Sequence, residues 1–509
     1  MSRYSRRRFL RQASTLAAAG ALLPACSDSS DRAPTPGNAV VIGSGFAGSV
    51  AALRLAQAGI PTTVLERGQE WTVQGNDTFP STTGLDHRAT WTIPPSRVAD
   101  GQGEAYAGLL ENIGSPNVTA VCGACVGGGS LVYGGVLIQP PRAAFESVFP
   151  YLDYGAMAGT YYPRVIAEIG AAPIPDDVLA SPTYRAHRRF IVDAGAAGME
   201  VVKANASFDW DIIRREIAGE IPAAASVSDY AFGCNSNAKL STDKNYLQRA
   251  RASGFAEVRS LTEVEMIRQL DAGGYAVICR RLSAEGETLD RYELVADYLF
   301  LAAGSLNTGK LLLKSQQAGE LRGGNDRVGQ GWGTNGDELL AQRHPDVGGG
   351  PQGGPACIAA VDNTNPDYPV AFMHSPIPFG GTQLQLAMSV PDELGSLRYD
   401  PGRDALAIDW PDDTQTPSAL ARAASFQQLT AQTGGAPTPF ISGTIWHPLG
   451  GAVMGDACSE LGELHGYRNL FVIDGALLPG SAATVNPALT VAANAERIME
   501  QLVPRVLHG

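Results

Sequence analysis

The sequence predicts a mixed α/β fold (α+β overall), in which a parallel sheet assembled from discontinuous segments is joined by a second, sheet-based domain. Short apolar runs typical of buried strands recur near the start, the middle and the end of the chain, at residues 38–42, 298–303 and 469–473. Alternating apolar and polar residues at 383–388 and 405–410 predict a separate sheet with one buried face. Segments of the first domain are therefore expected to flank those of the second.

Length and charge limit the classes of function. The chain has 509 residues, enough for two or three domains with a large core. Charged residues make up 17 % and apolar residues 44 %, the balance of a packed globular protein. The net charge is −13 and no long run of lysine or arginine occurs, so nucleic acid is not expected as a partner.

Residues 1–36 are typical of an export signal followed by a tether. The pair Arg6-Arg7 and Arg8-Phe9-Leu10 precede an apolar stretch at 13–25 that is too short to span a bilayer as a helix. The paired arginines resemble a twin-arginine signal, which exports proteins already folded. Residues 23–26 resemble a lipobox, which predicts membrane attachment through a lipidated Cys26. The competing interpretation is ordinary cleavage that leaves a soluble periplasmic or secreted protein. No other stretch has the about 18 consecutive apolar residues that a membrane span needs.

The cysteines do not form a scaffold. Beyond Cys26, six cysteines are scattered along the chain, too sparsely for a fold built on disulfides. Cys122 and Cys125 have the spacing of a redox motif, but they lie in a glycine-rich loop, so we expect buried thiols or one local bridge. No second cysteine or histidine pair has matching spacing, so no metal site is predicted.

A dinucleotide-binding motif opens the part of the chain beyond the signal. The strand at 38–42 leads into the glycine triplet Gly43, Gly45 and Gly48, which also contains Phe46, and a helical pattern follows to Gln57. In such a motif the first glycine allows a tight turn, the second lets the backbone approach a pyrophosphate and the third lets helix and strand pack closely. A second strand at 62–65 ends at Glu66, where a carboxylate can bind a ribose and would repel a 2′-phosphate. The motif therefore favours NAD or FAD over NADP.

Later segments favour FAD. A second glycine cluster, Gly127 to Gly129 with Ser130, can lie against a flat ring or a diphosphate. A β-hairpin at 263–280 leads to the middle strand, which stops at Gly304 before a helix at 307–313, and the last strand ends in Asp474-Gly475. A ligand that contacts the start, middle and end of the chain is long, which suits FAD. We therefore predict a Rossmann-like FAD-binding domain from 37–153, 229–336 and 445–509, and a substrate-binding domain from 154–228 and 337–444.

The chain resembles the glucose–methanol–choline (GMC) oxidoreductases, and within them most closely the bacterial cholesterol oxidases that bind FAD without a covalent bond. The resemblance covers about residues 38–502. It depends on the opening glycine motif and on four further segments: 127–130, 300–306, 328–333 and 447–451. It implies an FAD-dependent enzyme that oxidises alcohols.

The resemblance also implies a catalytic pair, His447 and Asn486. By itself, a histidine beside Pro448 and glycines is more often structural. The resemblance implies instead that His447 hydrogen-bonds to the substrate hydroxyl or deprotonates it. Asn486 precedes Pro487 and a helical pattern, so it could simply cap that helix. The resemblance gives Asn486 a second role, as a polar contact to substrate and flavin, with Pro487 beside the cofactor.

The sequence departs from the steroid oxidases at two positions. Those enzymes carry a glutamate that moves the steroid double bond, and Met373 stands at the corresponding place. A thioether cannot abstract a proton, so either His374 takes over, or the enzyme does not isomerise, or its substrate is not such a sterol. Tyr133 stands where the steroid oxidases tend to have asparagine in the flavin loop.

The substrate-binding segments contain helical patterns at 156–169 and 183–194 in addition to the alternating strands. The glycine- and proline-rich stretch at 348–355 is expected to form loops near the mouth of the site. Candidates for lining an apolar substrate cavity, each also compatible with plain core, are Met373, His374, Phe379, Leu386 and Trp446.

The sequence thus predicts an exported FAD-dependent oxidase of a bulky apolar alcohol, with a 3β-hydroxysteroid such as cholesterol as the expected substrate and O2 as the electron acceptor. Two alternatives stay open. One is a dehydrogenase of the same fold that acts on a non-steroid alcohol and uses a quinone or cytochrome. The other is an envelope lipoprotein that binds an apolar ligand without turnover.

Overall fold

A parallel sheet of five strands carries the predicted dinucleotide motif. A computed structural model describes residues 37–93, 104–433, 436–438 and 443–508, so the predicted signal and lipobox at 1–36 lie outside the described residues. The strands run in the order β22 (Leu470–Val472), β12 (Tyr298–Leu301), β1 (Ala39–Ile42), β2 (Thr62–Leu65) and β8 (Ala256–Arg259). All neighbouring pairs are parallel, and β1 and β12 are buried along their whole length. The α/β prediction is confirmed, including the assembly of one sheet from distant segments.

Helices cover this sheet because their apolar residues face its buried strands. Helix α1 (Phe46–Gln57) follows β1 directly and packs against α12 (Ala488–His508) and α9 (Tyr246–Ala252). Helix α10 (Ser305–Gln317) follows β12 in the same way. Helix α5 (Tyr162–Ile169) also packs against α12, although the sequence assigned it to the substrate-binding part.

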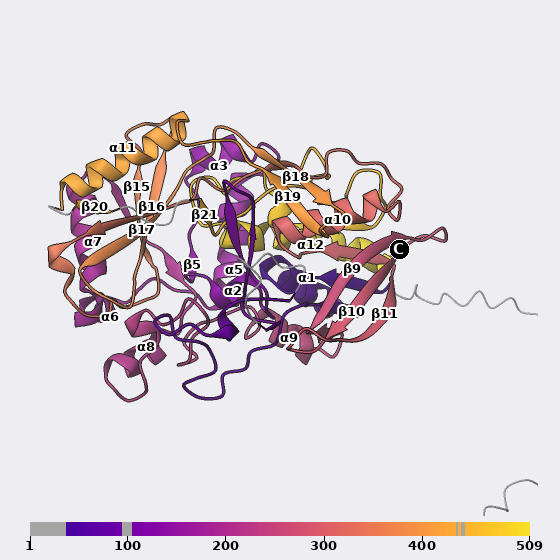
Figure 1. Ribbon diagram of the computed structural model, residues 1–509, viewed down its shortest axis with the longest axis horizontal. Coiled ribbons are helices and arrows are strands. Elements are labelled where there is room, and N and C mark those ends of the chain that lie inside the picture. Colours follow the sequence, from indigo (N-terminus) through magenta and orange to yellow (C-terminus); the bar gives the residue numbers. More distant parts are fainter. Residues whose placement is uncertain (1–36, 94–103, 434–435, 439–442, 509) are drawn as a thin grey trace, which may run out of the picture. The chain divides into compact units, whose positions relative to one another are not determined.

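The predicted hairpin at 263–280 is present and has a third strand. β9 (Thr262–Gln269), β10 (Tyr275–Leu282) and β11 (Thr288–Ala296) form an antiparallel sheet and lie side by side in Figure 1. β11 is mostly exposed, so it lacks the apolar pattern that would have revealed it.

The second large sheet has six strands, with helices on one face. Its order is β20 (Ala436–Thr438), β14 (Glu338–Arg343), β17 (Thr382–Met388), β16 (Val370–Ser375), β15 (Ile358–Asp362) and β6 (Glu200–Lys203). Figure 1 shows α11 (Pro417–Ala431, orange) beside these strands, and α11 and α7 (Arg185–Ala196) both contact them. Side chains alternate: Phe372 and Ala387 pack toward the helices, whereas Met373 and Leu386 belong to a cluster on the other face.

The alternating run at 405–410 does not belong to this sheet, contrary to the sequence expectation. Its strand β19 (Ala405–Asp409) pairs with β18 (Gly395–Asp400), which pairs with β13 (Gln330–Trp332) in a separate small sheet. β18 and β19 pack on α10 of the nucleotide-binding part. Alternation predicts a half-buried strand but not which sheet the strand joins.

The remaining elements are short. The helices are α2 (Gly129–Val132), α3 (Arg142–Val148), α4 (Tyr154–Ala156), α6 (Asp176–Ala180) and α8 (Trp210–Ile217), and the strands are β3 (Leu110–Gly114), β4 (Thr119–Gly123), β5 (Val136–Leu137), β7 (Asn205–Ala206) and β21 (Thr444–Ile445). Within the described ranges, no helix has the length and apolar character needed to cross a membrane. The described residues all belong to one compact unit, so the domain boundaries drawn from the sequence stay predictions.

Candidate active site

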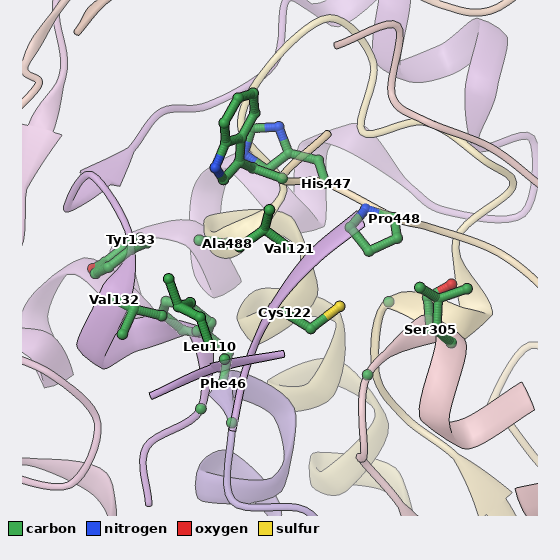
Figure 2. Close-up of a pocket in the computed structure, with 18 of the residues that line it drawn as sticks. Phe46, Leu110, Val121, Cys122, Val132, Tyr133, Ser305, His447, Pro448 and Ala488 are labelled. Atoms are coloured by element: carbon green, nitrogen blue, oxygen red, sulfur yellow. The ribbon is translucent and has the colours of Figure 1, made fainter. Parts of the chain in front are cut away.

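A cavity of about 670 Å³ lies where the nucleotide-binding sheet meets the six-stranded sheet. The turns after β1 and β12 contribute to its wall, together with the glycine cluster before α2 and the segment that precedes α12. Figure 2 shows Pro448 and Ser305 on one side of the pocket and Tyr133 and Val132 on the other. The predicted site residues that line it are Gly43, Gly45, Phe46, Glu66, Gly128, Gly129, Gly304, Met373, Leu386, Trp446, His447, Asp474, Gly475, Asn486 and Pro487.

The glycine motif has the geometry that its sequence predicts. Gly43 has φ = +98°, in the left-handed region that favours glycine. Gly48 does not line the cavity, because it packs against the backbone: a Cβ there would overlap the carbonyl oxygen of Gly43. At Gly45, which precedes the first residue of α1, no atom lies within 4 Å of the place a Cβ would occupy, so the backbone faces open space. This helix N-terminus can therefore receive a phosphate group.

Two buried carboxylates tie the nucleotide-binding turns together. Glu66 accepts hydrogen bonds from the backbone N–H of Ser44 (3.1 Å) and of Gly68 (2.9 Å). Asp474 accepts from the N–H of Gly304 (2.8 Å) and from the hydroxyl of Thr308 (2.7 Å), which joins the end of β22 to the turn after β12. Burial raises the pKa of Asp474 above its ordinary value.

Hydrogen bonds on the side away from the cavity hold the second glycine cluster in place. The N–H of Gly127 donates to Ser44 Oγ (3.1 Å), and Ser130 Oγ donates to the carbonyl of Gly127 (2.6 Å). Neither Gly127 nor Ser130 lines the cavity, so both support the loop rather than contact a ligand. The hydroxyl of Tyr133, the departure noted in the sequence, bonds to Ser207.

Lys239 supports the same loop and was not found from the sequence. It is fully buried, and its Nζ donates to the carbonyls of Leu131 (2.9 Å), Tyr133 (2.8 Å) and Tyr230 (2.6 Å). Burial lowers the pKa of Lys239 to about 7. A lone lysine among small residues in the sequence gives no signal that it will lie inside the protein.

His447 is held by a carboxylate that the sequence analysis also missed. Its Nδ1 lies 2.8 Å from Asp337 Oδ1, and Asp337 Oδ2 accepts from the backbone N–H groups of Trp446 (2.9 Å) and His447 (3.0 Å). The Asp337 side chain is 0 % exposed and that of His447 is 13 % exposed. Asp337 lies four residues beyond the end of the predicted family segment 328–333, but 110 residues separate it from His447. Only the fold brings the two together.

Asn486 faces His447 rather than capping α12. Its Nδ2 lies 3.3 Å from His447 Nε2, and its Oδ1 is buried without a hydrogen-bond partner among the described residues. The capping interpretation is therefore wrong for the side chain. Asn335 holds the segment that carries Asn486: it donates to the carbonyl of Val485 (3.0 Å) and accepts from the N–H of Ala482 (2.8 Å).

The substrate end of the cavity is apolar. Met373, Leu386 and Trp446 line it as expected, together with Val136, Leu339, Ala356, Ile377 and Leu384. Phe379 does not line it and is 54 % exposed.

His374 does not line the cavity either, because alternation along β16 turns it to the opposite face from Met373. Its ring contacts those of His187 (centroids 4.7 Å apart) and Phe190 (5.4 Å). Burial lowers the pKa of His374 well below its ordinary value. The proposal that His374 replaces the missing glutamate is therefore contradicted by its position.

Cys122 and Cys125 are free thiols, as one of the two sequence interpretations expected. Cys122 lines the cavity, and burial raises its pKa to about 12. A thiol in that state is a poor nucleophile, which argues against redox chemistry by this pair.

The residues of the cavity fit FAD. Open space lies at the Cβ positions of three lining glycines, Gly45, Gly129 and Gly304. A ligand can therefore lie close to the backbone at these positions, which together form a cradle. Glu66 can bind the ribose, the N-terminus of α1 the pyrophosphate, and the flavin ring would lie toward His447, Asn486 and Pro487.

Fold and site together define a protein with a dinucleotide-binding sheet and a cavity that fits FAD. The chain belongs to the GMC oxidoreductase family: the models of its N-terminal and C-terminal parts match residues 38–331 and 404–495. Members of this family bind FAD, in agreement with the cradle that the cavity provides.

Individual relatives are distant. The chain is 25 % identical to a cholesterol oxidase of Acinetobacter baumannii, over 91 % of this chain and 94 % of that protein. It is 26 % identical to a cholesterol oxidase of Mycobacterium tuberculosis, over 90 % and 89 %. An uncharacterized GMC-type oxidoreductase of Mycobacterium tuberculosis is 28 % identical, but that match spans only 57 % of this chain and 41 % of the relative.

Solved structures show the shared fold. A pyridoxine 4-oxidase from Mesorbium loti superposes with a TM-score of 0.62 at 18 % identity, over 91 % of this chain and 98 % of that one. A fungal aryl-alcohol oxidase gives the same TM-score at 14 % identity, over 92 % and 99 %. At such low identity the likeness extends to the fold and not to the substrate.

Proposed function

We propose that this protein oxidises the CH–OH group of a bulky apolar alcohol, with a 3β-hydroxysteroid as the expected substrate and O2 as the final electron acceptor. The observation that carries the proposal is the His447–Asn486 pair beside a cavity wall built from aliphatic side chains. Likeness to two cholesterol oxidases over nearly the whole chain supports the substrate class. When bound, FAD supplies the acceptor for the hydride that leaves the carbinol carbon.

The side chains at the site accept the proton, orient the hydroxyl and bind the hydrocarbon body of the alcohol. His447 Nε2 faces the cavity and accepts the hydroxyl proton of the alcohol. With one N–H of Nδ2 directed at His447, Asn486 still has a second N–H and a free acceptor on Oδ1, so it can orient the same hydroxyl. The apolar wall around Met373 and Leu386 binds the hydrocarbon body and keeps water from the reacting carbon.

Oxidation proceeds without isomerisation in this proposal. Met373 occupies the position of the acid that moves the double bond in steroid oxidases, and it lines the cavity. His374 lies behind the wall, so it cannot reach a steroid in the cavity. Among the described lining residues of the substrate end, none carries a carboxylate close to Met373.

We also propose export by the twin-arginine route and attachment through a lipidated Cys26, both from the sequence of residues 1–36 alone. An oxidase that must bind FAD before export suits a route for folded proteins. Replacing Arg6 and Arg7 by lysine should retain the protein in the cytoplasm, and Cys26→Ala should release it from the membrane fraction. Export that ignores the arginine substitutions would contradict the route.

The test of the proposed activity is anaerobic reduction of the bound flavin. Purified holoenzyme under argon is mixed with cholesterol, a long-chain primary alcohol or a polyol, and the loss of flavin absorbance is followed. The proposal expects rapid bleaching by cholesterol, slower or no bleaching by the polyol, and hydrogen peroxide when air is admitted. Bleaching without peroxide in air would favour a dehydrogenase that uses a quinone or cytochrome. No bleaching by any alcohol would overturn the catalytic proposal and favour a binding protein.

A further inference from the structure

The turn Thr334–Asp337 lies between the two halves of the site and holds both catalytic side chains in place. Asn335 binds the segment 482–485 that precedes Asn486, and Asp337 binds Trp446 and His447. Asp337 immediately precedes β14, the first strand that follows the nucleotide-binding segment and belongs to the six-stranded sheet. The turn therefore contacts the segments of both functional residues from within four consecutive residues.

The contacts of Asp337 determine its hydrogen-bonding role. Its Oδ2 receives two backbone N–H groups, which can only donate, so this oxygen acts as an acceptor. Its Oδ1 lies 2.8 Å from His447 Nδ1, a hydrogen-bond distance that requires one proton between the two atoms. Imidazole is more basic than a carboxyl group by about 2.5 pKa units in model compounds, so this proton resides on the nitrogen.

We propose that Asp337 is a positioning residue that fixes the proton of His447 on Nδ1 and thereby leaves Nε2 as a lone pair that faces the cavity. In this tautomer His447 is a proton acceptor for the substrate hydroxyl rather than a hydrogen-bond donor to it. The catalytic consequence rests on the proposed function, whereas the tautomer itself does not.

Asn486 agrees with this assignment independently. Its Nδ2, which carries only donors, lies 3.3 Å from Nε2, as expected beside a lone pair. Its Oδ1 remains without a partner in the described part of the chain, although it is buried. If Nε2 carried the proton, the amide would gain a hydrogen bond by turning Oδ1 toward it. The carboxylate of Asp337 therefore sets the orientation of the Asn486 amide as well as the tautomer of His447.

The carboxylate also matters once the proton has moved. When Nε2 takes the hydroxyl proton, His447 becomes an imidazolium cation 2.8 Å from a buried anion. The Asp337 side chain has no solvent exposure, so water screens this attraction little. Loss of the charge should therefore slow proton transfer without weakening the apolar contacts that bind the substrate.

The variant Asp337→Asn tests the tautomer at constant shape. In the variant, the side-chain oxygen at position 337 still accepts from the backbone N–H groups of Trp446 and His447. The side-chain NH2 group then takes the place of Oδ1 and faces His447 Nδ1. That NH2 group can only donate, so the proton of His447 must move to Nε2. Nuclear magnetic resonance of holoenzyme labelled with 15N-histidine distinguishes the two ring nitrogens, and the signal lost in His447→Gln identifies the residue.

The expected result is a protonated Nδ1 in the wild type and a protonated Nε2 in Asp337→Asn at neutral pH. A wild-type His447 protonated on Nε2, or an unchanged tautomer in the variant, would overturn the proposal. This measurement needs no substrate, so it remains decisive even if no alcohol reduces the flavin.

Kinetics provide the second readout, with the alcohol that bleaches the wild-type flavin. Asp337→Asn should lower kcat by roughly 10²- to 10⁴-fold and change KM only a few-fold, while the bound FAD absorbance stays the same. The control is Asp362→Asn, which replaces a buried carboxylate at the end of β15 that does not line the cavity. Equal kcat values in Asp337→Asn and the wild type would contradict the role in catalysis.

Discussion

At the scale of single residues, the proposed chemistry depends on His447 and Asn486, which lie 3.3 Å apart, and on Asp337, which holds His447. His447 and Asn486 could be named from the sequence because each lies in a local motif that resembles a family pattern. Asp337 and Lys239 could not, because His447 lies 110 residues from Asp337 and two of the three carbonyls that Lys239 binds lie more than 100 residues away. The expectation for His374 failed for a different physical reason: a strand places successive side chains on opposite faces, so only one of two neighbours can face the cavity.

The first prediction concerns the product made from a Δ5-3β-hydroxysteroid. Because Met373 cannot transfer a proton and His374 lies behind the wall, the ketone should accumulate with its double bond unconjugated. Chromatography of the products, with the ultraviolet absorbance of the conjugated enone as the marker, measures the ratio. Enone formation as fast as flavin reduction would reveal a base that the cavity lining does not provide.

At the scale of elements, periodicity and glycine spacing predicted the parallel sheet, α1 and the segments that approach the cofactor. Buried strands with continuous apolar runs, such as β1 and β12, are recognised easily. The exposed strand β11 was missed and β19 was assigned to the wrong sheet, because pairing partners are chosen by tertiary packing rather than by the strand itself.

The second prediction tests the glycine cradle at the end of β12. Gly304 has φ = +84° and open space at the position of a Cβ, and it lines the cavity. Gly304→Ala should lose FAD, because it adds a methyl group to the ligand space as well as backbone strain of about 1–3 kcal/mol, since φ = +84° with ψ = +156° is a conformation essentially restricted to glycine.

The matched control for this variant is Gly254→Ala. Gly254 has φ = +78°, also has open space at the Cβ position, and lies at an exposed turn after α9. It should keep its full FAD content, while its own positive φ costs some stability. The flavin-to-protein absorbance ratio and a denaturant titration give both quantities. Equal FAD content in the two variants would show that Gly304 serves the backbone only.

At the scale of the whole molecule, stability should depend on pH through two buried histidines, His374 on β16 and His187 on α7. Burial lowers the pKa of His187 to about 4 and that of His374 well below its ordinary value. Between pH 6.5 and 4 the unfolded chain binds protons that the folded chain does not. The free energy of unfolding therefore falls as the pH is lowered, by on the order of 3 kcal/mol for a shift like that of His187.

Urea titrations at pH 7 and pH 4.5 measure this third prediction. His374→Leu should reduce the loss of stability on acidification, because it removes one of the two proton acceptors that only the unfolded state exposes. His87→Gln, at an exposed position, is the control and should keep the full loss. Identical acid sensitivity in His374→Leu and the wild type would contradict the assignment.

The whole-molecule account depends most on His447 as the proton acceptor for the alcohol. Stopped-flow measurement of anaerobic flavin reduction tests this role directly, with wild type, His447→Gln and the exposed His465→Gln as control. We expect His447→Gln to lower the rate constant by roughly 10²- to 10⁴-fold at unchanged FAD content, and His465→Gln to match the wild type. Flavin reduction at the wild-type rate in His447→Gln would contradict the account.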